Sequence, residues 1–320
     1  MAPIPKTMNG ILVEKTGGTE VLQYKTDLQV PTPKEGEILV KNSIIGINYI
    51  DTYFRSGLYQ APKPEILGKE GAGKIIAIGP GVSGFVENDS VVWMGSSGYA
   101  EYSAAPASRT VKIPEAITES DACAAMLQAL TALTLTEESY AVQKGDWILV
   151  LAASGGVGTW LCQILRAKGA HTIATVGSRA KAQMPQDMGA EVVLVEDEEG
   201  DDGVKKAIME KTGGLGVQCV FDGVGKATFD RSLDVLARKG TLASFGNASG
   251  AVPPFAISPT LFNYVSTREE IMTYTGRLFT MMTEEKFDVK IHKIYPLKDV
   301  AQAHNDLEGR KTMGKLLLAP

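Results

Sequence analysis

The sequence predicts an α/β protein in which a β-rich part is followed by a doubly wound parallel sheet. Three observations support this fold class. The chain has 320 residues, enough for one large domain or two of ordinary size. Up to about residue 120, short runs rich in Val and Ile are bounded by Gly, Pro, Asn and Asp. After Trp147, apolar runs alternate with segments of helix-forming residues.

The first part is predicted to be a compact all-β unit. Its strand-like runs are GILVEKTGG, EGEILVKNSIIGIN, GKEGAGKIIAIGPGV, DSVVWMG and YAEYSAAPASRTVKIP. Short segments of this composition fit a pleated, half-buried surface. The next segment, SDACAAMLQALTALTLTEESYA, has apolar residues at helical spacing and predicts a helix with Ser120 as its N-cap.

The second part alternates strand and helix. The predicted strands are WILVLA, HTIATVG, EVVLVE, VQCVFDGVG and TLASFGN, and the predicted helices are TWLCQILRAKG, AKAQMPQDMG, GVKKAIMEKTGG and ATFDRSLDVLARKG. The strands are continuously apolar, as a parallel sheet covered on both faces requires. Beyond them, TREEIMTYTGRLFTMMTEEK predicts a helix, and the last thirty or so residues predict strand, helix and strand.

Composition excludes several classes of function. With 44% hydrophobic residues and a net charge of −5, the chain is typical of a globular protein and lacks the basic field that binds nucleic acid. The three cysteines and three histidines are scattered, so no metal site is predicted. No apolar run reaches the roughly 18 residues of a membrane span, and MAPIPKTMNG lacks a signal-peptide core. We therefore expect a cytoplasmic protein with buried, reduced cysteines.

The segment LVLAASGGVGTWLCQ carries a dinucleotide fingerprint. Ala153-x-Gly155-x-x-Gly158 follows a predicted strand and opens a predicted helix, which is the context that gives the motif meaning. Small residues let the backbone approach a pyrophosphate, and the helix N-terminus favours its negative charge. The alternative is a tight packing turn without a ligand.

The end of the next strand indicates which dinucleotide binds. An NAD site usually carries Asp or Glu about 20 residues after the glycines, to bond the ribose 2′-hydroxyl. Here Gly177 and Ser178 are neutral, and Arg179 and Lys181 follow. This pattern favours NADPH, although Arg179 and Lys181 are also typical of solvated charges in the first turn of a helix.

The whole chain resembles the quinone oxidoreductase (zeta-crystallin-like) branch of the zinc-free medium-chain dehydrogenase/reductase superfamily. The resemblance rests on GINYIDTYFRSGLY, GKEGAGKI, LQALTALTL, AASGGVG, FDGVG, SFGNASGA and GKLLL, in the family's order. It implies a GroES-like catalytic domain of residues 1–128 with 289–320, a Rossmann NADPH-binding domain of residues 129–288, and an active site in the cleft between them. Lys69 stands where zinc-dependent relatives carry a histidine, and their cysteine lobe is absent, so the resemblance implies zinc-independent chemistry.

The same resemblance implies the site residues. The motif N-x-x-D-x-Y stands here as Asn48, Asp51 and Tyr53. Asn48 would hydrogen-bond in the nicotinamide pocket, Tyr53 would donate to a developing oxyanion, and Asp51 would position its neighbours. Without the resemblance, these are three polar residues near a turn. The implied cofactor-binding residues are Asn48, Gln128, Thr131, Ser154, Gly155, Gly156, Val157, Gly177, Ser178, Lys181, Phe245, Gly246, Asn247 and Arg310.

Three positions depart from the family pattern. Glu196 falls at or near the place of a tyrosine that flanks the phosphate in NADPH-specific members, and a carboxylate there repels a phosphate unless its loop turns away. Ala129 replaces a glycine, a mild change within a helix. Between Ser258 and Pro259 the family has a further segment on the order of ten residues, a strand and its turn. Its loss would affect dimerisation and activity.

These observations predict an NADPH-dependent quinone oxidoreductase, with water or Tyr53 supplying protons and a homodimer if the segment near Ser258 is intact. One alternative is an NADPH-dependent reductase of α,β-unsaturated carbonyls, since the same site could deliver hydride to an alkene carbon. The other is a non-catalytic NADPH-binding protein with a structural or RNA-binding role. The sequence leaves open the physiological acceptor and the number of electrons moved per step.

Overall fold

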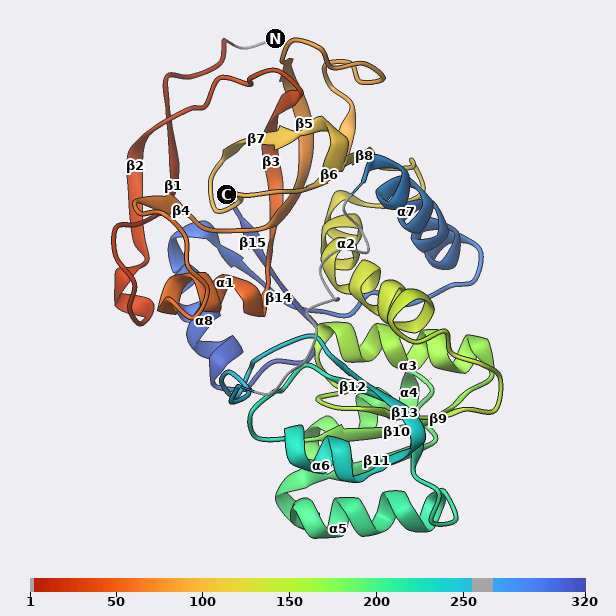
Figure 1. The fold of residues 1–320 in the computed structure, drawn as a ribbon. Coiled ribbons are helices and arrows are strands. Elements are labelled where there is room, and N and C mark those ends of the chain that lie inside the picture. The colour runs from red at the N-terminus through yellow and green to blue at the C-terminus, as the bar shows by residue number, and fades with distance from the viewer. Residues whose placement is uncertain (1–2, 255–266) are drawn as a thin grey trace. The chain divides into compact units, whose positions relative to one another are not determined.

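The computed structural model describes residues 3–254 and 267–320, and contacts within the chain divide it into two units (Figure 1). Unit 1 is Met1–Leu127 with Thr267–Pro320, and unit 2 is Gln128–Ser266. Residues 267–288, which the sequence analysis assigns to the Rossmann domain, group with unit 1. The expected domain limits, 1–128 with 289–320 and 129–288, stay a prediction.

Unit 1 is built on two sheets. Its strands are β1 (Thr7–Val13), β2 (Gln23–Gln29), β3 (Glu37–Ile47), β4 (Glu65–Ile66), β5 (Glu70–Ile78), β6 (Ser90–Met94), β7 (Tyr102–Pro106), β8 (Thr110–Lys112), β14 (Ile291–Pro296) and β15 (Lys315–Ala319). The small sheet has the order β2-β1-β4, and the large sheet has the order β14-β15-β3-β5-β6-β8, with β7 also paired to β3. The long strand β3 therefore lies between β15 and β5, and its apolar side chains are buried in the core.

In the described part of unit 1, four α-helices accompany these sheets, and the first corrects an expectation. They are α1 (Tyr49–Ser56), α2 (Glu119–Thr134, which continues into unit 2), α7 (Arg268–Thr283) and α8 (Val300–Glu308). The expected all-β unit is wrong at α1, because Asn48 begins a helix that ends at Gly57 in a left-handed conformation. The Asp51 carboxylate accepts the Asn48 backbone N–H at 2.8 Å, which supports the first turn.

The predicted N-cap of α2 also needs correction. The helix begins at Glu119, so Ser120 lies inside its first turn. The Thr118 hydroxyl accepts the Asp121 backbone N–H at 3.0 Å and donates to the Asp121 carboxylate at 2.8 Å. Thr118 is therefore the capping residue, since it satisfies one of the N–H groups that a helix start leaves unpaired.

Unit 2 has the predicted doubly wound parallel sheet, which confirms the fold class. Its strands are β9 (Trp147–Val150), β10 (His171–Val176), β11 (Val192–Val195), β12 (Val217–Asp222) and β13 (Leu236–Ser244), in the order β11-β10-β9-β12-β13. All neighbouring pairs are parallel. The helices between them are α3 (Gly156–Lys168), α4 (Gln183–Asp187), α5 (Glu196–Lys211) and α6 (Phe229–Asp234). Helix α3 contacts α4, and α5 contacts α6.

Helices α5 and α6 of unit 2 have bounds that differ from the predicted ones. Helix α5 begins at Glu196 rather than near Gly203, because four acidic residues occupy its first turn, where the helix dipole favours negative charge; Gly200 then kinks it. Helix α6 is shorter than ATFDRSLDVLARKG, because strand β13 already begins at Leu236, where it pairs with Val217 of β12.

Three other expectations concern the Ser258–Pro259 junction, the cysteines and membrane-spanning helices. The Ser258–Pro259 junction lies outside the described residues. Cys123, Cys162 and Cys219 are buried and free of disulfides, as expected. Among the described residues, no helix has both the length and the apolar composition to span a membrane.

Candidate functional site

The glycine loop connects β9 to α3 in unit 2. Ala152 adopts a left-handed φ of 49°, which is uncommon for alanine, and Gly155 precedes the first turn of α3. A Cβ at Gly158 would lie 2.6 Å from Ala153 Cα, so only glycine allows this approach of helix and strand. The loop thus has the close packing and the helix N-terminus that a pyrophosphate site requires.

The side chain of Gln128 lies against this loop. A Cβ at Gly156 would lie 2.0 Å from Gln128 Oε1, so the amide of Gln128 occupies the space beside the start of α3. Thr131 and the buried Ala129 are on the same helix, α2. The structure therefore places Gln128 beside the predicted cofactor loop.

The end of β10 has space beside its backbone. A Cβ at Gly177 would have nothing within 4 Å, so the backbone there is open to a ligand. Ser178 precedes a short 3-10 helix, Arg179–Lys181. Arg179 Nε donates to Glu198 at 3.0 Å, so this exposed guanidinium has an acidic neighbour. These residues fit a ribose with a 2′-substituent better than a bare hydroxyl held by an acid.

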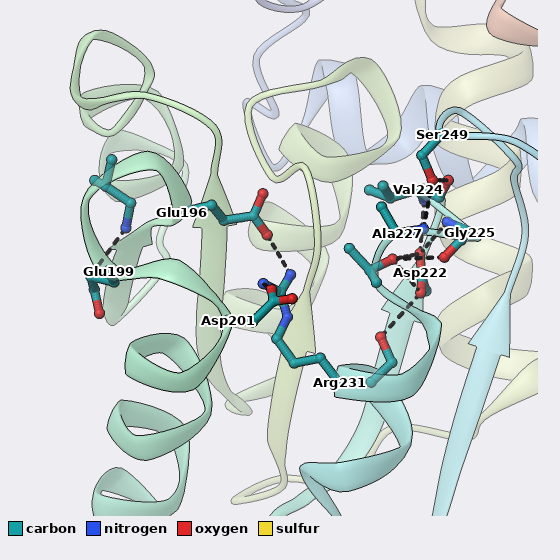
Figure 2. Close-up of polar contacts among 12 residues, drawn as sticks. Glu196, Glu199, Asp201, Asp222, Val224, Gly225, Ala227, Arg231 and Ser249 are labelled. Carbon is teal, nitrogen blue, oxygen red and sulfur yellow. Dashed lines mark hydrogen bonds and ion pairs between the residues drawn. The ribbon is translucent and has the colours of Figure 1, made fainter.

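Glu196 is held by an ion pair. Its Oε1 atom lies 2.5 Å from Arg231 Nη2 of α6, and Asp201 Oδ1 lies 2.5 Å from Arg231 Nη1 (Figure 2). The Arg231 side chain is only 6% exposed. The carboxylate that the sequence analysis expects to repel a 2′-phosphate is therefore paired with a cation.

A second polar cluster shapes the loop after β12. Asp222 is fully buried, and its carboxylate accepts the Val224 N–H at 2.8 Å, the Gly225 N–H at 3.0 Å and the hydroxyls of Thr228 and Ser232 (Figure 2). This loop contacts the predicted nicotinamide-side residues, which are Phe245, Gly246 and Asn247. A Cβ at Gly223 would lie 2.8 Å from the Phe245 ring, and one at Gly246 would lie 2.5 Å from Gly223 O. The residues after β12 and β13 are therefore packed against each other.

In unit 1, Asn48 belongs to a buried polar network. Its Nδ2 donates to Glu70 Oε1 at 2.8 Å, and its Oδ1 accepts from Lys315 Nζ at 2.6 Å. Lys315 also forms an ion pair with Glu70, and the two side chains are 1% and 0% exposed. Glu70 Oε2 accepts the Leu127 N–H at 2.8 Å. Glu70 and Lys315 were not predicted as site residues from the sequence, although both stand in the stretches GKEGAGKI and GKLLL.

Strand pairing explains why these three residues meet. Gly46 of β3 pairs with Glu70 of β5, and Ile47 pairs with Leu316 of β15. Asn48, the next residue, thus lies between the first residues of β5 and β15. A Cβ at Gly46 would lie 2.2 Å from Glu70 Oε1, so this glycine makes room for the carboxylate.

Asp51 begins a second buried network. Its Oδ2 accepts the Tyr99 hydroxyl at 2.8 Å, while Oδ1 has no hydrogen-bond partner among the described residues. The Tyr99 oxygen lies 3.2 Å from His304 Nε2, and Arg55 Nη1 lies 2.9 Å from His304 Nδ1. Because Tyr99 donates to Asp51 and Arg55 can only donate, His304 carries its proton on Nε2.

These contacts shift two pKa values in opposite directions. Burial raises the pKa of Asp51 from 3.8 to about 6, against the lowering effect of its hydrogen bonds from Asn48 and Tyr99. Burial, followed by the Arg55 charge, lowers the pKa of His304 from 6.5 to about 3. Asp51 is thus suited to hold a proton in mildly acidic solution, and His304 to stay neutral.

The pH dependence of the free energy of unfolding should reveal the contribution of Asp51. Folded Asp51 binds protons more readily than unfolded Asp51 between its two pKa values, so its contribution to the free energy of unfolding falls by about 2 kcal/mol from pH 4 to pH 6. His304 acts oppositely, because its folded pKa is lowered. In Asp51→Asn, the free energy of unfolding should therefore rise more steeply from pH 4 to pH 6 than in the wild type. Urea unfolding at several pH values measures this; parallel profiles would contradict it.

The remaining predicted residues of unit 1 lie around α1. The Tyr53 ring contacts Tyr49 and Tyr59, with centroids 5.6 and 5.0 Å away, and its side chain is largely buried. Lys69 lies over the Phe54 ring, 4.1 Å from the centroid. Burial and the Glu308 charge raise the pKa of Tyr49, and Arg310 is one of two cations that oppose this rise. The predicted contact of Arg310 with the 2′-phosphate stays a prediction.

A GroES-like β unit together with a Rossmann-type sheet defines a medium-chain dehydrogenase/reductase. The family models agree: residues 34–115 match the alcohol dehydrogenase GroES-like domain, and residues 156–285 match the domain called zinc-binding dehydrogenase. Within residues 3–254 and 267–320, no group of three His, Cys, Asp or Glu residues is arranged to hold a metal ion.

Similar proteins show to which branch of the medium-chain dehydrogenase/reductases the chain belongs. The chain is 40% identical to a probable quinone oxidoreductase of Schizosaccharomyces pombe over 97% of each chain. It is also 40% identical to quinone oxidoreductase 1 of Escherichia coli, over 96% of this chain and 98% of the relative. The crystal structure of an Escherichia coli quinone oxidoreductase complexed with NADPH superimposes with a TM-score of 0.92 at 38% identity, over 98% of this chain and 100% of that one. The chain belongs to the quinone oxidoreductase family, as the sequence analysis predicts.

Proposed function

We propose that this chain is an NADPH-dependent quinone oxidoreductase. The observation that carries the proposal is the neutral, open end of β10 at Gly177 and Ser178, beside a glycine loop, in a chain whose relatives are named quinone oxidoreductases. Similar structures from a mycobacterium and from Escherichia coli are complexed with NADPH, which supports this cofactor. When bound, NADPH supplies the reducing equivalents, and the quinone accepts them.

The chain's own residues then bind, orient and donate protons. The proposed cofactor-binding residues are those inferred above: Asn48, Gln128, Thr131, Ser154, Gly155, Gly156, Val157, Gly177, Ser178, Lys181, Phe245, Gly246, Asn247 and Arg310. Tyr53 would donate a hydrogen bond to the reduced quinone oxygen, and its ring would stack on a flat acceptor. Asp51 supports α1, which carries Tyr53, and holds a proton at Oδ1 at mildly acidic pH.

Enzyme assays test the proposal directly. Purified protein should oxidise NADPH in the presence of ortho- or para-quinones and should turn over a simple enone more slowly in the same preparation. If the protein binds NADPH but oxidises it with none of the quinones tested, the proposed activity is refuted and only the proposed cofactor stands. The comparisons favour neither the enone-reductase nor the non-catalytic alternative.

Removing the Tyr53 hydroxyl should lower turnover. In Tyr53→Phe we expect kcat for quinone reduction to fall about 10-fold, because one donor to the developing oxyanion is lost. The dissociation constant of NADP+ should stay within about twofold, since the ring contacts with Tyr49 and Tyr59 are kept. Tyr59→Phe is the matched control. If kcat is unchanged in Tyr53→Phe, water rather than Tyr53 supplies the proton to the quinone.

The assembly and the compartment are proposals as well. We propose a homodimer if the segment near Ser258 is intact, as the resemblance implies, and sedimentation of the purified chain would test it. Three buried cysteines without disulfides fit a reducing compartment and support a cytoplasmic location. Fractionation of cells that produce the chain would test that location.

A further inference from the structure

The acidic tract of residues 196–202 begins where the sheet edge meets the predicted 2′-phosphate site. Glu196 is the first residue after β11, and β11 is the neighbour of β10. The Asp197 N–H donates to Gly177 O at 3.3 Å, so the backbone of this tract contacts the end of β10. Four acidic residues within the first turn of α5 would oppose a dianionic ligand here unless their charges are neutralised or directed elsewhere.

The structure gives separate partners to several of these carboxylates. Glu198 pairs with Arg179. Glu199 accepts the Val195 N–H at 3.2 Å (Figure 2). Glu196 is directed toward α6, where Arg231 holds it at 2.5 Å. Arg231 is the buried cation of this group, because its side chain is 6% exposed whereas that of Arg179 is 71% exposed.

We propose that Arg231 is a positioning residue for cofactor choice: by holding Glu196 against α6, it keeps this carboxylate away from the 2′-phosphate of NADPH. The inference rests on the proposed function, because it assumes that Gly177 and Ser178 receive that phosphate. Arg231 follows β12, 35 residues after Glu196, and acts only through it. Glu196 stands at or near the position of a neutral tyrosine in the family pattern, and its ion pair makes it compatible with a phosphorylated ribose.

A binding experiment separates this role from general stability. Isothermal titration measures the dissociation constants of NADP+, NAD+, adenosine 2′,5′-bisphosphate and 5′-AMP for the whole chain. In Arg231→Gln, the freed Glu196 should weaken the two 2′-phosphorylated ligands about 10- to 30-fold. NAD+ and 5′-AMP should change by less than about threefold, because they carry no charge at this position.

Rescue and control variants complete the test. In Glu196→Gln/Arg231→Gln the repelling charge is gone, so the affinity for NADP+ should return to within about threefold of the wild type. Lys205→Gln removes another cation that links α5 to α6, through Asp234 at 2.7 Å, and should leave the ratio of NADP+ to NAD+ affinity unchanged. Arg231→Lys, which keeps one charge, replaces Arg231→Gln if the latter does not fold and should show a smaller loss with the same selectivity.

Equal weakening of NADP+ and NAD+ in Arg231→Gln, or a double variant that does not recover, would overturn the inference. These outcomes differ from failure of the proposed function. If the wild type binds neither dinucleotide, the proposed function fails. If it prefers NADP+ and Arg231→Gln keeps that preference, only the role of Arg231 fails.

Discussion

Lys315→Met should lower the free energy of unfolding by about 3–5 kcal/mol, because it leaves a buried carboxylate without its counter-charge. Glu70 is 0% exposed, and Lys315 is its ion-pair partner. The remaining donors to Glu70, Asn48 Nδ2 and the Leu127 N–H, are neutral. Since unit 1 contains all of these groups, its unfolding transition should show the loss.

Urea unfolding of the variants provides the measurement. In Glu70→Gln/Lys315→Met no charge is left in the network, so most of the lost stability should return. Lys206→Met breaks an ion pair of which both members are more than two-thirds exposed, and it should cost less than about 0.5 kcal/mol. A Lys315→Met variant as stable as Lys206→Met would mean that the buried pair contributes no more than a surface pair.

The same substitution connects stability with the proposed site. Lys315 Nζ donates to Asn48 Oδ1, and Asn48 precedes α1, which carries Tyr53. Without Lys315, the Asn48 amide oxygen loses its charged donor, and the amide keeps the bond from Nδ2 to Glu70. Quinone turnover by Lys315→Met is measured below the unfolding temperature of the variant. If the rate equals that of the wild type, Asn48 does not need Lys315 as a partner.

Local patterns predicted the regular elements well where packing and propensity agree. The continuous apolar runs of β9, β10, β11 and β12 are typical of a covered parallel sheet, and the glycine loop followed from its place between strand and helix. Helix α1 was missed because only eight residues separate Asn48 from Gly57. Its signal was present, since Asn48 and Asp51 stand at capping-box spacing.

The paired charges could not be predicted in this way. Lys315 and Glu70 are 245 residues apart, and only the pairing of β15 and β5 on either side of β3 brings them together. Arg231 and Glu196 meet because α5 and α6 contact each other. From the sequence, Glu196 could either weaken the NADPH site or turn away, and its ion pair with Arg231 on another helix could not be foreseen. Periodicity and spacing carry no information on contacts of this kind.

Gly158→Ala should abolish most cofactor affinity, with a loss on the order of 100-fold for NADP+ and of 1–3 kcal/mol in stability. The added Cβ would lie 2.6 Å from Ala153 Cα and 2.7 Å from Ala153 O, and backbone atoms cannot yield as the end of a flexible side chain can. Helix α3 must therefore move away from the loop at Ala153, and its first N–H groups move with it. Because those groups would hold the pyrophosphate, NADP+ and NAD+ should lose affinity equally.

A matched substitution separates this clash from the general effect of replacing glycine in a helix. Gly276 lies within α7, and a Cβ there would meet nothing within 4 Å. Gly276→Ala should therefore leave NADP+ affinity unchanged and raise stability by about 0.5–1 kcal/mol. Titration calorimetry and thermal unfolding of both variants decide the matter. If Gly158→Ala binds NADP+ as the wild type does, the turn at Ala153–Gly158 serves packing alone, and the pyrophosphate must be held elsewhere.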